Sequence, residues 1–433
     1  MSRVDKKRNQ LRHKLIDKIP TKTICMVSIV KNESRNMVRL LDSLVDIIDY
    51  VSIVDTGSTD NTIEVIENWL KKNNVVGVVH QEPFRDFGYN RTHSVMMAKK
   101  TFPQADYLLL SDADFVWKID VGNTFNKKLL FAHQYSVTQR STDIAYTNIR
   151  LLSNQVDWVC EGVTHEYWKD APIQSTFKGQ VMSHHLTTIE IVDLEDGGCK
   201  SDKYERDERL LEHDLQNPTL SEFLKIRYSF YLAQTYKCLQ KFDKSIAMYQ
   251  QRISYGGWDE EIYMSHYQIG ICYEMWKSML IYAVTMLDKS TRTLQEELYL
   301  KKWNSDNLSM DELKIKTVEY INLAIEWHIK AWEFRKTRCE SLAKAVILLR
   351  DIYKHEEAYK YCHIARKIPL SKDTLFVEPR AYDSWFYDYE LSIDCFYLQK
   401  IEEGQNVCLK LLEKDDLAPE VRASVEAHCN FYL

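Results

Sequence analysis

Residues 107–114 read YLLLSDAD, an apolar run of strand length that ends in two carboxylates. A strand that is apolar at every residue can be buried on both faces of a parallel sheet. In open α/β sheets, ligands bind outside the carboxyl ends of the strands. Asp112 and Asp114 at such an edge could hold Mg²⁺ or Mn²⁺ through oxygen ligands, and the ion could bridge to a nucleotide diphosphate. The alternative is a solvated turn, which the position directly after a buried strand disfavours.

Outward from this run, short apolar segments alternate with amphipathic ones. Alternation of strand and helix predicts a parallel sheet that is covered on both faces. From about residue 129 to residue 183 the pattern becomes one of mixed strands, and after Lys200 it is helical almost to the end of the chain. The expected strands are Ile24–Val30, Val51–Val54, Val75–Val79 and Tyr107–Leu110, and the expected helices between them are 36–44 and Ile63–Leu70.

The helical half carries a weak internal repeat. Ala233 and Gly270 lie 37 residues apart, and each is followed by a tyrosine three positions later. Ala324 and Ala358 lie 34 residues apart. A small residue where two helices cross, with an aromatic residue at helical spacing, is what a tetratricopeptide hairpin needs. Because residues 280–310 interrupt the repeat, an irregular helical bundle is the alternative to the all-α, tetratricopeptide-like domain that we expect.

Composition excludes several classes of protein. Glycine and proline number only 12 and 8 of 433 residues, which argues against an all-β sandwich or a disordered chain. Lys and Arg total 57 against 63 Asp and Glu, a net charge of −6 that does not favour a nucleic-acid partner. The ten cysteines contain no C-x-x-C pair, which is typical of reduced thiols. No apolar run reaches the ~18 residues of a transmembrane segment.

These features predict a cytoplasmic protein with two domains. Residues 1–22 form a basic N-terminal extension without the apolar core of a signal peptide. We expect an α/β domain at residues 23–200 and a helical domain at residues 201–433, and the helical domain could bind a protein partner.

A second strand also ends in an acid. Residues 51–62 read VSIVDTGSTDNT, in which a glycine turn and a helix start follow Asp55. Helix capping accounts for the hydroxyl residues and Asp60, but it gives no reason for Asp55. A carboxylate there could accept a hydrogen bond from a uracil imide or a ribose hydroxyl. No G-x-G-x-x-G motif is present, which argues against a dehydrogenase.

Three segments in register resemble family 2 glycosyltransferases: residues 27–33 (VSIVKNE), residues 54–62 and the Asp112–Asp114 triplet. The resemblance extends over about the first 190 residues. It implies the α/β GT-A fold with a D-x-D metal site that binds Mn²⁺ or Mg²⁺. It also implies transfer of a sugar, with inversion, from a nucleotide-diphosphate donor, of which UDP-sugar is the first candidate. The acceptor would be a glycan or a protein.

The resemblance also implies roles for residues that bind the donor. Asn32 and Glu33 match the Asn-Glu pair that follows the first strand of the family, near the nucleoside. Asp55 matches the first acid of the family pattern V-D-D-G-S-x-D, in which Thr56 here replaces the second acid. This replacement makes the nucleoside contact of Asp55 less secure without removing it.

Further roles concern the diphosphate and the metal. Residues 86–91 resemble a loop whose arginine, here Arg91, faces the diphosphate, although Thr92 stands where asparagine is usual. Asp112 and Asp114 match the metal pair of the family. Asp112 is also expected to contact the donor, and Asp114 is the expected direct ligand of the ion.

The general base is expected farther along the chain. Residues 158–166 read WVCEGVTHE and resemble a W-x-G-x-x-H-E block found in one branch of these enzymes. Inversion requires a base that takes the proton of the acceptor hydroxyl. Glu166 or His165 could do this, and the resemblance favours Glu166. The alternative is that the two residues form a surface pair on a strand.

A histidine after the last strands completes the metal site in many GT-A enzymes. His184 and His185 follow an apolar stretch, and adjacent residues of an extended chain point to opposite faces. At most one of them would therefore reach the metal, and we favour His185.

Other functions remain open at this point. A repeat-domain interaction scaffold with a degenerate sugar-nucleotide-binding domain is the alternative to the enzyme. A sugar nucleotidyltransferase would need a Gly-rich signature after the first strand, which residues 30–33 do not provide. In the helical half, residues 385–387 (WFY) could offer a stacking platform for a sugar or peptide.

Overall fold

The computed structural model describes residues 16–120, 125–141, 145–171, 179–197, 202–373 and 375–432 of the chain. The chain divides into two compact units, Met1–Asn217 and Pro218–Leu433. Residues 1–15 of the expected extension lie outside the described residues. So do residues 198–201, where the expected boundary between the two domains falls.

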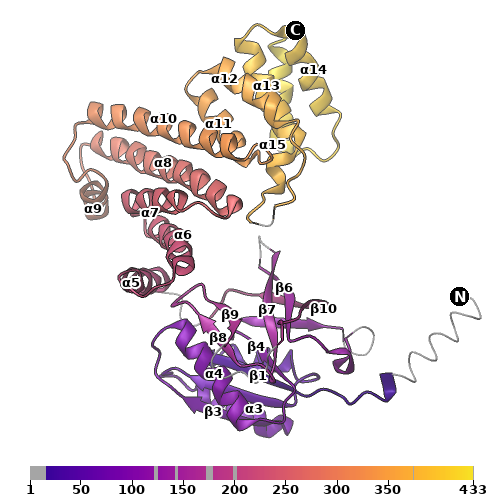
Figure 1. Cartoon of the computed structure of the whole chain (residues 1–433). Coiled ribbons are helices and arrows are strands. Elements are labelled where there is room, and N and C mark those ends of the chain that lie inside the picture. Colours follow the sequence, from indigo (N-terminus) through magenta and orange to yellow (C-terminus); the bar gives the residue numbers. More distant parts are fainter. Residues whose placement is uncertain are drawn as a thin grey trace, which may run out of the picture. The chain divides into compact units, whose positions relative to one another are not determined.

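The first unit is built on an eight-stranded sheet and a separate two-stranded hairpin (Figure 1). The strands are β1 (Ile24–Val30), β2 (Tyr50–Asp55), β3 (Val76–Gln81), β4 (Tyr107–Leu110), β5 (Phe115–Ile119), β6 (Gln134–Arg140), β7 (Ala145–Ser153), β8 (Trp158–Glu161), β9 (Tyr167–Asp170) and β10 (Ser183–Asp193). The order in the large sheet is β3-β2-β1-β4-β7-β6-β10-β5, and the hairpin pairs β8 with β9.

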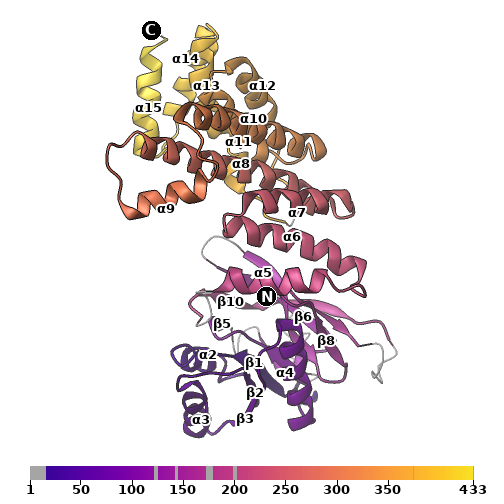
Figure 2. The same ribbon diagram turned by 90° about the vertical axis from the view of Figure 1, so that its left-hand side faces the viewer.

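Strands β3, β2, β1 and β4 run parallel to one another, as the alternating sequence pattern predicts. Their helices are α2 (Met37–Asp42), α3 (Thr62–Asn73) and α4 (Phe87–Thr101). Apolar residues of α2 and α3 pack on one face of the sheet, and those of α4 pack on the other (Figure 2). All four residues of β4 are buried because both of its faces are covered.

The remaining strands mix directions. β7 is antiparallel to β4 and β6, and β5 is antiparallel to β10. β10 runs parallel to β6, but its register shifts between Leu186 and Glu190, which leaves three residues of β10 without a partner on β6. This irregularity determines which residues of β10 reach the carboxyl edge of the sheet.

Helix α5 (Lys203–Leu215) belongs to the first unit, so the boundary between the compact units lies after it and not before it. The hydroxyl of Thr164 donates to Asp207 on this helix at 3.4 Å. The guanidinium of Arg206 lies 5.0 Å from the centroid of the Phe87 ring. The helix thus packs on the α/β domain through the 162–166 loop and the start of α4.

The second unit is all helical in its described part, apart from one short 3-10 turn (Figure 1). Successive helices pack as neighbours, and the small residues of the predicted repeat are buried where helices cross. A Cβ atom on Gly270 would lie 2.5 Å from the ring of His328, so only glycine lets α8 and α10 approach this closely. The helices are α6 (Glu222–Cys238), α7 (Phe242–Ser254), α8 (Asp259–Leu287), α9 (Leu294–Trp303), α10 (Met310–Phe334), α11 (Glu340–Asp351), α12 (His355–Ala365), α13 (Ser384–Tyr397), α14 (Ile401–Leu412) and α15 (Pro419–Asn430).

The predicted architecture, an α/β domain followed by an all-helical domain, is confirmed. Within the described ranges, no helix is both long enough and apolar enough to cross a membrane. Of the suggested platform at residues 385–387, Tyr387 is fully buried in the core and its hydroxyl donates to the carbonyl of Ala381 at 2.7 Å. Trp385 and Phe386 are partly buried and pack against the same core, so the platform stays a suggestion for these two residues alone.

Candidate functional site

The carboxyl ends of β1, β2 and β4 meet at one edge of the sheet. Val30 pairs with Asp55, and the amide of Ser111 donates to the carbonyl of Val27 at 3.0 Å, so the chain leaves all three strands at similar height. Each of the three strands brings one acid to this edge: Glu33 after β1, Asp55 at the end of β2 and Asp112 after β4. The strand order therefore gathers the predicted donor-binding acids, which lie far apart in the sequence.

Asp55 has a structural role that the sequence interpretation missed. Its Oδ1 accepts hydrogen bonds from the amides of Gly57 at 3.0 Å and Ser58 at 2.9 Å, so it stabilises the turn after β2. Its Oδ2 is buried and makes no hydrogen bond to any described residue. A buried carboxylate oxygen without a donor is costly unless a ligand supplies one.

Asn32 links the first loop to the second. Its φ of 57° is left-handed, a conformation that asparagine tolerates better than most residues. Its amide donates to the hydroxyl of Ser58 at 2.8 Å, and its Oδ1 accepts from the amide of Thr59 at 2.7 Å. The side chain of Asn32 is therefore engaged in holding the loops together.

The carboxylates of Glu33 and Asp114 both lie on the side of Gly197 where a Cβ atom would stand. A Cβ atom on Gly197 would lie 3.2 Å from Oδ2 of Asp114 and 3.3 Å from Oε1 of Glu33. The other oxygen of Glu33 accepts a hydrogen bond from the side chain of Asn36 at 2.9 Å. Two carboxylates thus face the same short segment of backbone.

This segment is fixed to α2 by an ion pair. Both carboxylate oxygens of Asp196 accept hydrogen bonds from Arg39, at 2.7 and 2.8 Å. Asn36 donates to the carbonyl of Asp196 at 3.2 Å. The chain after β10 is thereby held over the carboxyl edge of the sheet.

Asp112 is held by two guanidinium groups. Its Oδ1 accepts from Arg91 at 2.7 Å, and its Oδ2 accepts from Arg150 at 3.2 Å. Burial raises the pKa of Asp112, but the charges of the two arginines outweigh burial and hold the pKa below its ordinary value. Asp112 is therefore ionised, and both of its oxygens are engaged.

The sequence interpretation did not find Arg150. The side chain is buried, lies over the ring of Phe115 at 4.7 Å and donates to Oε1 of Gln139 at 2.8 Å. Gln139 donates in turn to Asp193, at the end of β10. The sequence predicts mixed strands over residues 129–183, but it does not indicate which side of a strand carries a buried charge.

Arg91 also pairs with the expected base. Its Nε lies 2.6 Å from Oε1 of Glu166, so Glu166, Arg91 and Asp112 form a continuous charged row. Arg91 lies on helix α4 and not on a loop as expected, because Asp86 caps the helix by accepting from the amide of Tyr89. His165 adopts a left-handed φ of 51° in the turn that presents Glu166.

Main-chain contact fixes the distance between α4 and the 162–166 loop. A Cβ atom on Gly88 would lie 2.5 Å from the carbonyl oxygen of Gly162 and 2.9 Å from that of Cys160. The hydroxyl of Thr92 accepts from the amide of Cys160 at 2.9 Å and donates to its carbonyl at 3.3 Å. Thr92, which departs from the family pattern, thus joins α4 to β8.

The two histidines lie elsewhere on the sheet. His185 pairs with Ser136, whose hydroxyl is 3.0 Å from its Nδ1, and the ring of His184 lies 5.5 Å from that of Phe131. The carbonyl of Asp114 accepts from the amide of Leu194, at the opposite end of β10. The structure therefore does not bring His185 to Asp112 or Asp114, because the length of β10 separates them.

The described residues contain no group of three histidine, cysteine or acidic side chains positioned for a metal ion. Mg²⁺ does not need such a group, since it is often bound by one or two carboxylates together with substrate phosphates and water. The carboxylates of Asp114 and Glu33 lie beside the same backbone segment, and such a pair fits an ion brought by a nucleotide.

The acids at the carboxyl ends of β1, β2 and β4 lie where open α/β sheets bind ligands. Residues 25–130 match the family model described as glycosyl transferase family 2. The matched range includes Asn32, Glu33, Asp55, Arg91 and the Asp112–Asp114 triplet, and it ends before His165, Glu166 and His185.

Two solved structures illustrate the likenesses of the chain. TarS from S. aureus (residues 1–349, in complex with UDP) is 15% identical, with a TM-score of 0.28, and the match covers 49% of this chain and 70% of that one. A thermophilic TPR protein from Thermus thermophilus is 11% identical, with a TM-score of 0.26, and the match covers 52% of this chain and 91% of that one. No curated protein matches the sequence.

Proposed function

We propose that the first unit is a metal-dependent, inverting glycosyltransferase. It would move a hexosyl or N-acetylhexosaminyl group from a UDP-sugar to a hydroxyl of a glycan or protein. The observation that carries the proposal is the charged row of Glu166, Arg91 and Asp112 beside Asp114, at the carboxyl edge of a sheet that matches a glycosyltransferase family.

The nucleoside would bind at the end of β2. The unpaired Oδ2 of Asp55 can accept a hydrogen bond from the imide N–H of uracil, which would remove the cost of burying that oxygen. Asn32 would contribute by holding the 57–59 turn in place. Uridine is proposed because its imide supplies one donor to one acceptor.

The diphosphate would leave beside Asp114. Asp114 and Glu33 would hold a Mn²⁺ or Mg²⁺ ion, which when bound supplies positive charge against the departing diphosphate. Arg91 adds fixed positive charge at this edge, and Arg150 keeps Asp112 in its ionised, oriented state.

Glu166 would take the proton of the acceptor hydroxyl. As that oxygen forms its bond to the anomeric carbon, its proton passes to the Glu166 carboxylate, and the bond from the anomeric carbon to the diphosphate oxygen breaks with its electron pair. The ion pair with Arg91 fixes the position of the carboxylate in the active site. The single displacement inverts the anomeric centre.

Nucleoside-diphosphate release tests the proposal. A panel of sugar nucleotides would be incubated with the full chain and Mn²⁺ or EDTA, alongside Asp114→Asn and the exposed control Asp46→Asn. We expect metal-dependent hydrolysis of one donor, lost in Asp114→Asn and retained in Asp46→Asn. Full activity of Asp114→Asn would refute the assignment. Absence of both turnover and donor binding would favour an interaction scaffold with a degenerate domain.

A further inference from the structure

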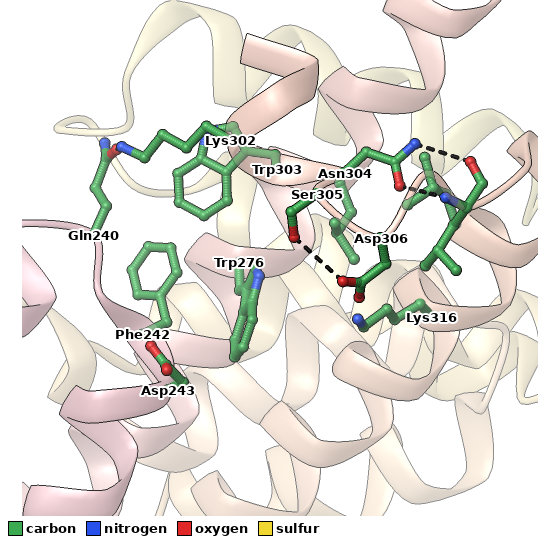
Figure 3. A pocket seen from close by; sticks show the side chains of 13 residues that line it. Gln240, Phe242, Asp243, Trp276, Lys302, Trp303, Asn304, Ser305, Asp306 and Lys316 are labelled. Atoms are coloured by element: carbon green, nitrogen blue, oxygen red, sulfur yellow. Dashed lines mark hydrogen bonds between the residues drawn. The ribbon is translucent and has the colours of Figure 1, made fainter. Parts of the chain in front are cut away.

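The second unit contains a cavity of about 270 Å³, which Figure 3 shows from close by. It lies between the start of α7, the middle of α8, the end of α9 and the start of α10. The sequence analysis assigns no site to these residues. Those that carry the inference are Phe242, Asp243, Trp276, Trp303, Asp306 and Lys316.

One side of the cavity is aromatic. The ring of Phe242 lies 5.6 Å from that of Trp303, at 29°, and 5.9 Å from that of Trp276, at 38°. Phe242 is buried, whereas both indoles are half-buried and line the opening. The three rings thus form the apolar side of the cavity, and the ammonium of Lys302 lies 4.7 Å from the centroid of the Trp303 ring.

The other side of the cavity is polar and is formed mainly by the loop after α9, which its own hydrogen bonds hold in place. Both polar atoms of the Asn304 side chain bond to the backbone of Leu308, at 2.8 and 2.9 Å. Asn304 therefore fixes the loop, and the exposed side chains of Ser305 and Asp306 lie along the cavity together with Lys316 from α10 (Figure 3). Donors and acceptors face the rings across the cavity.

The charges around the cavity balance. Lys302 and Lys316 provide two cations, and Asp243 and Asp306 provide two carboxylates. An equal number of charges of each sign gives no net attraction for a phosphate or a free acid. A neutral ligand with many donors and acceptors matches this lining better than an ion does.

We propose that this cavity binds one pyranose ring of a glycan. A pyranose has an apolar face of C–H groups, which suits the aromatic side, and hydroxyls that both donate and accept, which suit the polar side. The volume of about 270 Å³ lies just below the ~300–1,000 Å³ usual for small-molecule sites, so it accommodates one ring and not an oligosaccharide. Binding requires no transfer reaction. We also assign this glycan the role of sugar acceptor, and this second assignment rests on the proposed function.

Fluorine NMR of the full chain labelled with 5-fluorotryptophan tests the site. Signals of Trp276 and Trp303 would be assigned by substitution with phenylalanine, and that of Trp258, exposed and outside the cavity, serves as the internal reference. The probes are cellotriose, maltotriose, chitotriose and mannotriose, together with an unstructured decapeptide. We expect at least one saccharide to shift the signals of Trp276 and Trp303 and to leave that of Trp258 unchanged.

Two variants separate binding from folding. Asp306→Asn removes a charged acceptor from an exposed loop, and we expect it to weaken saccharide binding about tenfold, as the loss of one charged hydrogen bond does. Trp303→Ala should weaken binding further. The control Asp311→Asn changes an exposed carboxylate that does not line the cavity and should bind as the unmodified chain does.

Three results would overturn the inference: no saccharide shifts the two signals, Asp306→Asn binds as tightly as the unmodified chain, or only the peptide shifts them. None of these depends on donor turnover. Loss of metal-dependent hydrolysis in every preparation would refute the glycosyltransferase and leave the saccharide site standing.

Discussion

Both units bury networks of charged side chains, but to different extents. In the first unit the Asp112 side chain keeps a quarter of its surface exposed, although two arginines hold it. In the second unit Arg338 and Glu340 expose at most 1% of their surface, and Arg338 donates a hydrogen bond of 3.0 Å to Glu340. A paired charge that keeps access to solvent can meet a ligand, whereas a fully enclosed pair can only hold the fold together.

The Arg338 network illustrates the enclosed kind. Its guanidinium also pairs with Asp373 at 3.3 Å and donates to the carbonyls of Leu375 and Phe376, so it connects α11 to the segment before α13. The hydroxyl of Tyr382 donates to Glu340 at 3.0 Å. All polar groups of the network face protein, which makes it a structural element of the helical unit.

The largest effect should come from opening this enclosed network. Arg338→Met leaves the buried carboxylate of Glu340 without its cation, while Asp373 keeps its ion pair with Arg335. We expect the helical unit to lose about 3–5 kcal/mol of unfolding free energy. Urea denaturation followed by far-ultraviolet circular dichroism measures it. Lys314→Ala removes an exposed pair with Asp311 and should change stability by less than about 0.5 kcal/mol. Equal losses in the two variants would contradict the distinction between the networks.

The exposed network should affect activity before stability. Arg150→Leu frees one oxygen of Asp112, and we expect kcat/KM for donor hydrolysis to fall roughly tenfold to a hundredfold. Arg140→Leu, on the neighbouring strand, removes a surface pair with Glu190 and should leave turnover unchanged. An Arg150→Leu chain with normal kinetics would place Asp112 outside the reaction.

A smaller effect concerns pH in the second unit. Burial raises the pKa of Glu390 from 4.5 to about 7, despite the nearby charge of Arg350. Because the folded state holds this proton more tightly than the unfolded state does, the stability it contributes is complete below pH 4.5 and is lost as the pH rises through 7. Hydrogen exchange of α13 should show opening that becomes easier over this range by about 1–3 kcal/mol.

Glu390→Gln cannot titrate and should flatten that profile. Glu402→Gln changes an exposed residue of α14 and should leave the slope as it is. A slope that survives in Glu390→Gln would assign the titration to another group, such as the neighbouring Asp394, whose pKa burial also raises.

Sequence alone predicted the parts of the molecule whose signal is local. The all-apolar β4 and the acids directly after it are contiguous, and the small residues at helix crossings recur at a near-constant spacing. The roles given to Asp112, Asp114 and Asp55 stay predictions. The alternating pattern predicts the parallel sheet, and the order of its strands, which the structure supplies, places the three acids at one edge.

The contacts of the site that the sequence did not predict depend on packing between segments that are distant in the sequence. Arg91 and Glu166 are 75 residues apart and meet because α4 packs on β8, which no motif encodes. Arg150 reaches Asp112 from the middle of an ordinary strand. The position of His185 depends on the register of β10 with β6, and the irregularity after Leu186 has no sequence signature that we recognise.

The contact between Gly88 and Gly162 bears on how this protein could be re-engineered. Because two peptide backbones touch there, the separation of helix and loop does not depend on the size of any side chain. The side chains of Arg91 and Glu166 project from these two segments, so replacing either side chain should leave the positions of the two backbones unchanged. New reactivity could be introduced at positions 91 and 166 by substitution alone. A single methyl group at position 88, in contrast, would push helix α4 and the 162–166 loop apart.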